Sequence, residues 1–411
     1  MRIVHFSDVH IGVENYTKID PDTGMSTRLM DFLSTFDEVV SYSIDNDVDL
    51  VLFCGDAYKS REPSQTHQRE FAKRINQLSS SGIPVFLLLG NHDMPHVVSK
   101  ATALDIFSTL EVPNLYIGDS LKTYKIPTKG GLIQIVALPW IRRSAFLVRK
   151  EIQGLNHEEI NESIQKSLTE LILANAQKLD NSVPAIFAGH VSIGEAVTSS
   201  EQSMMLGRDH VLLKSAVALP QFDYVALGHV HRHQILGNDP KIVYSGSLQR
   251  VDFGEEKDDK GFCVLDIDPA KPAGLRVDNF EFKNVDAREF LSILVEIHEG
   301  DPNPTNTVIE AISRNHIDGK IVKLIIKLPI DLEGQIQDSE VRKALQGAHF
   351  LASISKEVTQ QVKTRLGHTD SKIPHPKQAL ALYLESRNVP DDRAKLLIEH
   401  ADGLIDYEDL E

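Results

Sequence analysis

Five short apolar runs recur between residues 3 and 227, and each is followed directly by a glycine or a polar residue. One of them is Phe86–Leu89, which precedes Gly90, Asn91, His92 and Asp93. The others are Ile3–Ser7 before Asp8, Leu50–Cys54 before Gly55-Asp56, Ala185–Ala188 before Gly189-His190, and Tyr224–Leu227 before Gly228-His229. Unbroken runs of this length are typical of buried strands. The pattern predicts an α/β fold whose strands present polar groups at their carboxyl ends.

Apolar residues at helical spacing fill several of the intervening segments. Helices are predicted at about 26–47, 66–80, 101–110 and 158–179. Ser26 or Thr27 is the expected cap of the first, because a hydroxyl there can accept a bond from an unpaired backbone N–H group. The runs Leu115–Ile117 and Leu132–Leu138 favour antiparallel strands.

The last third of the chain predicts two smaller parts. A small α/β unit is expected over about 280–360, with helices at 286–298 and near 305–314 and an alternating strand at Ile321–Leu328. Beyond it, Pro376 and Pro390 each open a short amphipathic helix. Two such helices cannot bury both apolar stripes alone, so they either fold back on the chain or dock on a partner. We therefore predict three parts, 1–278, 279–360 and 361–411.

The polar residues that follow the five runs form one candidate site. In open α/β sheets, ligands bind in the crevice beyond the carboxyl ends of the strands, so residues far apart in sequence can converge there. The candidate set is Asp8, His10, Asp56, Asn91, His92, His190, His229 and His231. Carboxylate, amide and imidazole donors favour manganese or iron, and a shared carboxylate is typical of two-metal hydrolytic centres. Each residue alone could simply cap a strand.

Taken together in this order, the motifs resemble those of the calcineurin-like metallophosphoesterases. The matching blocks are Asp8-Val9-His10, Gly55-Asp56, Gly90-Asn91-His92-Asp93, Gly189-His190 and Gly228-His229-Val230-His231. Within the family the chain is most similar to nuclease subunits of DNA double-strand break repair, on the opening Met1–Gly12 and on Tyr244–Ser247. The resemblance implies a two-sheet sandwich flanked by helices, a small α/β cap and a C-terminal helical hairpin.

The resemblance also implies a role for each residue of the site. It places one ion on Asp8, His10, Asp56 and His231 and a second on Asp56, Asn91, His190 and His229. Two Mn²⁺ ions are expected, with Fe²⁺ or Mg²⁺ as alternatives. His92 would protonate the leaving sugar oxygen or stabilise charge on the phosphoryl group. Asp93 would either orient His92 or begin a helix, and Ser245 and Ser247 would lie beside the substrate phosphate.

The substrate and partners follow from the resemblance alone. It implies a 3′–5′ exonuclease on duplex DNA and an endonuclease on single strands, acting in DNA recombination and repair. It further implies a homodimer within a heterotetramer, in which the C-terminal helices grip a coiled-coil ATPase. Lys59 departs from the family, because some relatives carry histidine three residues after the bridging aspartate. That departure leaves the balance between the two nuclease activities open.

Composition restricts the protein class further. The chain has 411 residues, is 41% hydrophobic and contains two cysteines, Cys54 and Cys263, both in apolar runs. This usage favours a reducing compartment over a disulfide framework. No apolar run approaches the roughly 20 residues of a membrane span. The chain opens directly on a strand without a signal peptide, so we expect a cytoplasmic protein.

The net charge of −16 is unusual for a protein that binds DNA. Basic residues nevertheless follow two of the predicted loops, with Lys59 and Arg61 after Asp56 and with Arg142 and Arg143 after Trp140. Their position favours phosphate contacts, although such clusters are often only solvated faces. Two other functions stay open, a phosphatase or small-molecule phosphodiesterase and a non-catalytic DNA-end scaffold. The cap and tail argue against the first, and His92 beside a full ligand set argues against the second.

Overall fold

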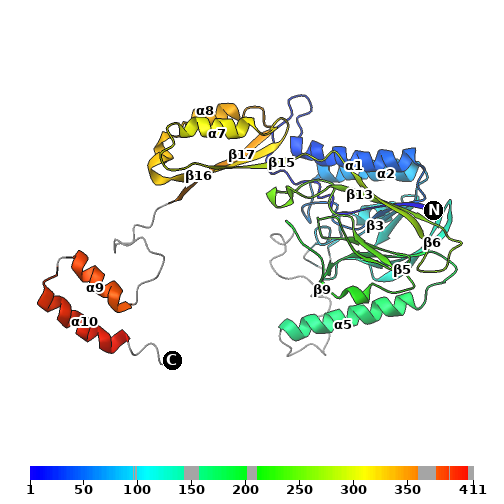
Figure 1. Ribbon diagram of the computed structural model, residues 1–411. Coiled ribbons are helices and arrows are strands. Elements are labelled where there is room, and N and C mark those ends of the chain that lie inside the picture. Colours follow the sequence, from blue (N-terminus) through cyan, green and yellow to red (C-terminus); the bar gives the residue numbers. More distant parts are fainter. Residues whose placement is uncertain are drawn as a thin grey trace. The chain divides into compact units, whose positions relative to one another are not determined.

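The computed structural model describes residues 1–95, 97, 100–142, 157–200, 211–359, 376–387 and 389–405. Two six-stranded sheets form its main body (Figure 1). The first sheet contains, in order, β14 (Val277–Asn284), β13 (Gly261–Ile267), β1 (Arg2–Phe6), β2 (Leu50–Phe53), β3 (Val85–Leu88) and β4 (Leu115–Gly118). The second contains β11 (Gln234–Asn238), β12 (Lys241–Tyr244), β10 (Tyr224–Gly228), β7 (Ala185–His190), β6 (Gly131–Leu138) and β5 (Lys122–Thr128). The predicted strands are therefore shared between two sheets.

The predicted helices of this body are present with small shifts of their ends. They are α1 (Thr27–Asp45), α2 (Gln65–Ser80), α3 (Asp105–Thr109) and α5 (His157–Ala176). The cap of α1 is Ser26, whose hydroxyl accepts a hydrogen bond from the backbone N–H of Leu29 at 3.2 Å. Short pieces complete the body, namely β8 (Ser192–Ile193), β9 (Val211–Leu212), η2 (Lys214–Ala216) and η3 (Phe253–Glu255).

Three large hydrophobic cores among the described residues hold these layers together. Helices α1 and α2 cover one face of the first sheet and α5 covers the outer face of the second (Figure 1). Successive side chains of β1 point to opposite faces of the sheet and so enter two different cores. Val4 and Phe6 pack with Phe36 of α1, whereas Ile3 packs between the sheets. Ile164 of α5 lies in the third core. The predicted fold class, a helix-flanked two-sheet sandwich, is confirmed.

Strand pairing after β3 differs from the prediction. The run in β4 pairs parallel to β3 in the first sheet, and the run in β6 pairs parallel to β7 in the second. The antiparallel partner of β6 is β5, whose mixed sequence Lys122–Thr128 gave no strand signal. The prediction that the two apolar runs are antiparallel strands is thus wrong, because a short apolar run carries no information about which sheet it joins.

A third sheet, of order β15-β16-β17, follows the second. Its strands are β15 (Phe290–Glu296), β16 (Ile321–Pro329) and β17 (Phe350–Thr359), accompanied by α7 (Pro304–Ser313), η4 (Ile330–Gln335) and α8 (Asp338–Ala344). The prediction of a helix at 286–298 is therefore wrong, because this segment contains the strand β15. Over so short a segment, the spacing of its apolar residues is compatible with both a helix and a strand. The buried residues of β15 include Phe290, Ile293 and Val295.

The C-terminal hairpin consists of α9 (Pro376–Ser386) and α10 (Asp391–Ile405). Leu384 is buried, whereas Tyr383, Leu396 and Leu397 are 44%, 56% and 41% exposed. The hairpin therefore keeps an apolar surface of its own.

The described chain divides into two compact units. One comprises Met1–Ile293, Ala311–Leu324 and Arg342–Ile354, and the other Leu294–Glu310, Ile325–Val341 and Ser355–Glu411. The three-part division at 278 and 360 stays a prediction. No helix among the described residues is long and apolar enough to cross a membrane.

Candidate metal centre

The predicted ligands converge although they come from two sheets. Asp8 and His10 follow β1, Asp56 follows β2 and Asn91 follows β3, all in the first sheet. The second sheet contributes His190 at the end of β7 and His229 and His231 after β10. All seven side chains are buried. The centre therefore lies where the carboxyl ends of both sheets meet.

The backbone at this edge is held in an uncommon conformation. The φ angles are +53° at Asp8, +48° at His10, +62° at Asp56 and +97° at His229. Side chains other than glycine rarely adopt such angles, and residues that do so often mark functional sites. Hydrogen bonds between the loops hold the conformation, since the N–H of Asp8 donates to the Gly55 carbonyl at 2.9 Å and that of His10 to the Asp56 carbonyl at 3.1 Å.

Asp8, His10 and His231 form the first cluster. The Nε2 atoms of the two histidines lie 2.9 Å apart, and His10 Nε2 lies 3.9 Å from Asp8 Oδ1. One potential ligand atom from each of the three residues falls within 4.8 Å of the others. The backbone N–H of His229 donates to Asp8 Oδ2 at 3.0 Å, which keeps the carboxylate turned toward the second sheet.

Asp56, His190 and His229 form the second cluster, with Asn91 between the two rings. Asn91 Oδ1 lies 3.0 Å from His190 Nε2 and 3.1 Å from His229 Nδ1. Asp56 Oδ2 lies 3.4 Å from His190 Nε2 and 3.7 Å from His10 Nε2. Asp56 is thus the carboxylate within reach of both clusters, as a bridging ligand requires.

The buried carboxylates and imidazoles of the centre shift one another's pKa values. Burial alone would raise the pKa of Asp56, but His190 and His92 hold it well below its ordinary value. Burial would lower the pKa of His190, yet the Asp56 carboxylate raises it to about 9. The pKa of Asp8 is raised and that of His10 is lowered, chiefly by burial in both cases. A bound cation would neutralise carboxylates that water does not reach.

The residues present fit a divalent-metal centre. The Nε2 atoms of His10 and His231 face each other in a buried site, and His10 Nδ1 has no hydrogen-bond partner among the described residues. The donors are carboxylate, amide and imidazole groups, which suit Mn²⁺ or Fe²⁺ better than a thiolate-selective metal. The centre can therefore hold divalent cations, and the geometry leaves their identity open.

His92 and Asp93 have different partners from those predicted. His92 is partly buried, and its Nδ1 lies 2.8 Å from the Lys59 carbonyl. Its backbone N–H donates to Asp56 Oδ1 at 2.8 Å. The Asp93 carboxylate instead accepts from the backbone N–H groups of Asp56, Ala57 and Gly90, each at 2.9 Å. Asp93 therefore ties the two ligand loops together and does not orient His92.

The basic residues predicted to contact DNA divide into three groups. Lys59 and Arg61 are partly buried beside the centre, and Arg61 Nε donates to the Asn91 carbonyl at 3.1 Å. Arg142 is partly buried, and its Nε has no hydrogen-bond partner in the described part of the chain. Arg143 lies outside the described residues.

Ser245 and Ser247 do not fit the predicted contact with the substrate phosphate. Both are fully buried. The Ser245 hydroxyl lies 2.8 Å from that of Ser7, and the Ser247 hydroxyl accepts a bond from Lys260 Nζ at 2.8 Å. These hydroxyls bond inside the protein and are not exposed to a DNA strand.

Several residues of the centre were not predicted. The Trp140 ring packs on His229 with centroids 4.9 Å apart. It follows β6, so the rule that sites form at carboxyl ends of strands could have found it. Glu255 and Lys260 lie directly behind His231. Nothing in their sequence pattern marks them, because their importance depends on burial.

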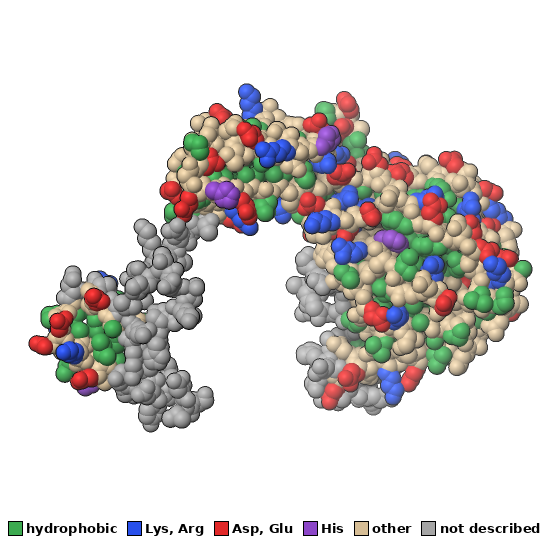
Figure 2. All heavy atoms as spheres, in the orientation of Figure 1, with side chains coloured by type: hydrophobic (Ala, Val, Ile, Leu, Met, Phe, Trp, Pro, Cys, Tyr) green, Lys and Arg blue, Asp and Glu red, His purple; other side chains and the backbone are tan. Residues whose placement is uncertain are grey.

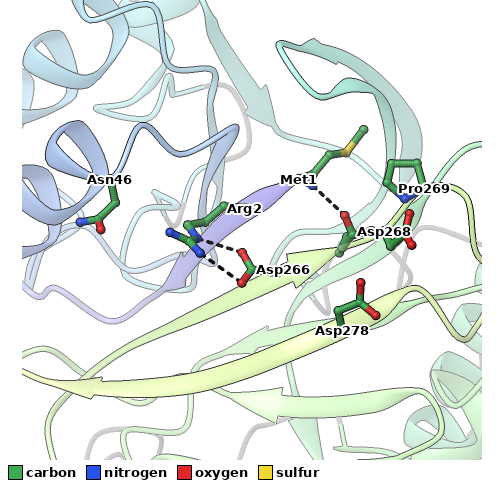
Figure 3. Close-up of a pocket in the computed structure, with 8 residues that line it drawn as sticks. Met1, Arg2, Asn46, Asp266, Asp268, Pro269 and Asp278 are labelled. Carbon is green, nitrogen blue, oxygen red and sulfur yellow. Dashed lines mark hydrogen bonds and ion pairs between the residues drawn. The ribbon is translucent and has the colours of Figure 1, made fainter.

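Figure 3 shows a surface hollow at the N-terminus. The Met1 amino group donates to the Ile267 carbonyl at 2.7 Å, and Arg2 Nε pairs with Asp266 Oδ1 at 2.8 Å. Strand β1 begins here and ends at the metal centre, so the two features lie at opposite ends of that strand. The charges of Arg2 and Asp266 are already paired, so we assign the hollow no ligand.

Comparison with known proteins supports the assignment of this site as a metal centre. The calcineurin-like phosphoesterase family matches residues 1–233. The chain is 28% identical over 270 residues to the SbcD component of nuclease SbcCD from Staphylococcus epidermidis, covering 65% of this chain and 66% of that protein. It is 25% identical over 262 residues to the SbcD component of nuclease SbcCD from Escherichia coli K12, covering 62% of each. The chain therefore spans less than two thirds of the length of these curated relatives.

Solved structures with distant similarity include a dimetal phosphatase from Danio rerio, with 11% identity, a TM-score of 0.35 and coverage of 64% of this chain and 92% of that one. The Plasmodium inner-membrane-complex anchor GAP50 has 12% identity, a TM-score of 0.34 and coverage of 69% and 89%. The family match extends over more than half of the chain and ends just after the last predicted ligand, His231. The chain belongs to the calcineurin-like phosphoesterase family.

Proposed function

We propose that this protein is a metal-dependent DNA nuclease, the catalytic component of an SbcCD-like complex. The observation that carries the proposal is a pair of buried clusters connected by Asp56, which belongs to the second cluster and lies 3.7 Å from His10 Nε2 of the first. Such an arrangement suits hydrolysis of a phosphoester by two ions. Similarity to the SbcD components of two SbcCD nucleases supports DNA as the substrate.

Each half of the centre would hold one ion. Asp8, His10, Asp56 and His231 would bind the first, and Asp56, Asn91, His190 and His229 the second. We propose two Mn²⁺ ions, with Fe²⁺ or Mg²⁺ as alternatives. When bound, such ions polarise the phosphate and lower the pKa of water toward neutrality.

His92 would act on the leaving group. Its Nδ1 faces the Lys59 carbonyl at 2.8 Å, so Nδ1 carries a proton and Nε2 is the atom available for exchange with the substrate. The ring packs edge-on against His10 with centroids 5.0 Å apart, which places it next to the first cluster. We propose that His92 protonates the leaving sugar oxygen or stabilises charge on the phosphoryl group.

Substrate contacts would surround the centre. Lys59, Arg61 and Arg142 are proposed to contact DNA phosphates. A hollow lined by Tyr16, Ser200, Phe253, Lys323 and neighbouring residues has a volume of about 550 Å³. Ser200 Oγ lies 3.2 Å from His231 Nδ1, the nitrogen that faces away from His10, so this hollow lies on the outer side of the His231 ring. We propose that a DNA strand contacts the protein there. Acidic and basic side chains are interspersed over the visible surface (Figure 2), so the negative net charge is not uniform.

The biological setting follows the named relatives. We propose a 3′–5′ double-strand exonuclease and single-strand endonuclease that acts on DNA ends and hairpins in recombination, repair and replication. The partners would be DNA, a second copy of this chain and an SbcC-like coiled-coil ATPase bound by the C-terminal hairpin. We propose a cytoplasmic location. The small third sheet would serve as the DNA-capping domain.

The test is a digestion panel with the purified full chain, with and without Mn²⁺. The substrates are hairpin DNA, linear duplex, single-stranded DNA, nucleotides and an aryl phosphate. We expect Mn²⁺-dependent cleavage of the DNA substrates. Cleavage restricted to nucleotides or the aryl phosphate would instead identify a phosphatase or small-molecule phosphodiesterase. No cleavage by a metal-loaded chain that still binds DNA ends would identify a scaffold.

A further inference from the structure

A buried ion pair lies directly behind the first metal cluster. Glu255 is in η3 and Lys260 precedes β13, and both side chains are 0% exposed. Lys260 Nζ lies 2.6 Å from Glu255 Oε2. The same ammonium donates to the Ser247 hydroxyl at 2.8 Å and to the His231 carbonyl at 3.1 Å. Its three N–H groups are therefore all used, and the pair is fixed in place.

The other oxygen of Glu255 faces a predicted metal ligand. Glu255 Oε1 lies 2.7 Å from His231 Nδ1, and the Ser200 hydroxyl donates to the same carboxylate oxygen. On the opposite side of the ring, His231 Nε2 points at His10 Nε2 at 2.9 Å. A carboxylate bound to an ammonium accepts hydrogen bonds and does not donate them. Nδ1 of His231 must therefore carry the proton, which leaves the Nε2 lone pair directed into the centre.

The support behind His231 differs from that behind two other histidines of the site. The outer nitrogens of His190 and His92 meet the backbone carbonyls of Cys54 and Lys59, at 2.7 and 2.8 Å, whereas that of His231 meets a charged side chain. A carboxylate behind a ligating imidazole fixes its tautomer and makes it a better donor, and removal of such a partner typically weakens metal binding by about 10–100-fold. Glu255 is thus positioned to affect one half of the centre more than the other.

We propose that Glu255, held by Lys260, is a positioning residue that sets the affinity of the Asp8–His10–His231 half of the centre for its ion. The proposal rests on the metal centre of the proposed function. It predicts that the two halves can be separated, because His190 in the other half is oriented by the Cys54 carbonyl and by Asn91 rather than by this ion pair.

The test measures Mn²⁺ binding by the full chain, by equilibrium dialysis and by electron paramagnetic resonance. In Glu255→Gln we expect one ion to stay tightly bound and the other to bind about 10–100-fold more weakly. The spectrum of a coupled ion pair should give way to that of a single Mn²⁺. The matched control is Asp223→Asn, which removes another buried carboxylate, paired with Arg276 at 3.3 Å and located at the opposite end of β10 from His229. The control should bind both ions like the native chain.

A second variant separates positioning from folding. Glu255→Gln leaves the Lys260 ammonium buried without its partner, which can destabilise a protein strongly. The double variant Glu255→Gln with Lys260→Met removes both charges. It should therefore recover the native melting temperature, while its affinity for the more weakly bound Mn²⁺ ion stays reduced. Native affinity for both ions in a folded double variant would overturn the proposal, as would an equal loss in Asp223→Asn. Failure of the native chain to bind Mn²⁺ would instead overturn the proposed function, and this inference with it.

Discussion

At the scale of single residues, the proposed function gives the metal ligands and His92 different roles. Asp56 reaches both clusters, whereas His92 shares a potential metal-binding group only with His10 and Asp56 among the described residues. The Nδ1 of His92 is already engaged by the Lys59 carbonyl. The roles of these two residues can therefore be tested by measuring metal content beside activity.

We predict that His92→Gln retains both ions and loses about 10²–10⁴-fold in cleavage rate, as expected for loss of a proton donor. Asp56→Ala should lose both activity and bound metal, because it removes the bridging carboxylate. Metal content is measured on the same preparations that are assayed. A His92→Gln protein that purified without metal would place His92 among the ligands.

His5 gives a pH-dependent prediction that does not involve the ligands. It is fully buried in β1, its Nδ1 lies 3.1 Å from the Tyr224 hydroxyl, and burial lowers its pKa to about 3. The unfolded chain, with an ordinary pKa near 6.5, binds a proton that the folded chain excludes. Stability is therefore unaffected above pH 6.5 and falls as the pH drops from there toward 3, by up to about 1.4 kcal/mol per pH unit.

The measurement compares native protein with His5→Asn, which keeps a polar partner for Tyr224 but does not titrate. Between pH 6.5 and 5 the melting temperature of the native chain should fall more steeply than that of the variant. Parallel curves would mean that His5 is protonated in the folded state without penalty.

At the scale of elements, the junction between β2 and its ligand loop leaves no room for a side chain. Gly55 links β2 to Asp56 with a φ of +97°, and a Cβ atom there would lie 2.3 Å from His190 Nδ1. Gly82, between α2 and β3, has a φ of +78° but no atom within 4 Å of such a Cβ. An alanine at either position would therefore have a strained backbone, and only at Gly55 would its Cβ also clash with a neighbouring side chain.

We predict that Gly82→Ala destabilises the chain by about 1–2 kcal/mol through its left-handed backbone alone. Gly55→Ala should destabilise it more and also lower its Mn²⁺ content, since His190 must move. Melting temperature and metal content are the readouts. Equal metal content in the two variants would show that the centre tolerates the displaced ring.

The C-terminal hairpin gives a prediction about the partner. Tyr383 and Leu397 are exposed, whereas Leu384 is buried within the hairpin. Exposed apolar patches commonly mark interfaces. We expect Tyr383→Glu with Leu397→Glu to abolish binding to the proposed coiled-coil ATPase while leaving the melting temperature and the proposed nuclease activity on short DNA unchanged.

Leu384→Glu serves as the contrasting variant, because it should unfold the hairpin itself. Pull-down with the ATPase and circular dichroism distinguish the two effects. Unaltered binding by the Tyr383/Leu397 variant would place the partner elsewhere on the chain.

At the scale of the whole molecule, the centre joins two sheets that separate cores already hold together. The ligands come from β1, β2 and β3 of one sheet and from β7 and β10 of the other. We therefore expect bound ions to add stability without being needed for folding, since ligands that bind only the native state stabilise it by mass action.

We predict that a chelator abolishes cleavage and lowers the melting temperature but leaves the circular dichroism at 25 °C unchanged. Added Mn²⁺ should restore both properties. The control is Asp56→Ala, whose melting temperature should not respond to chelator. Unfolding of the native chain by chelator at 25 °C would show that the three cores are insufficient alone.

The sequence by itself determined the elements with strong local signals. The sequence predicted the strands β1, β2, β3, β7 and β10 and the helices α1, α2 and α5. A strand buried on both faces is a continuous apolar run, and a helix buried on one face has apolar residues at helical spacing, so both can be recognised from the sequence. The same runs pointed to all seven candidate ligands, which follow the predicted strands closely in the chain. The predicted residues lie together in the structure, and their roles remain proposals.

Only the tertiary structure decided the features that depend on distant pairing. It assigned β4 and β6 to different sheets, made 290–296 a strand, and added β5, β17 and α8. It buried Ser245 and Ser247, gave Asp93 three backbone partners, and placed Glu255 and Lys260 behind His231. These outcomes depend on which surfaces meet, and a hydrogen bond between residues far apart in the chain has no local pattern from which it could be read.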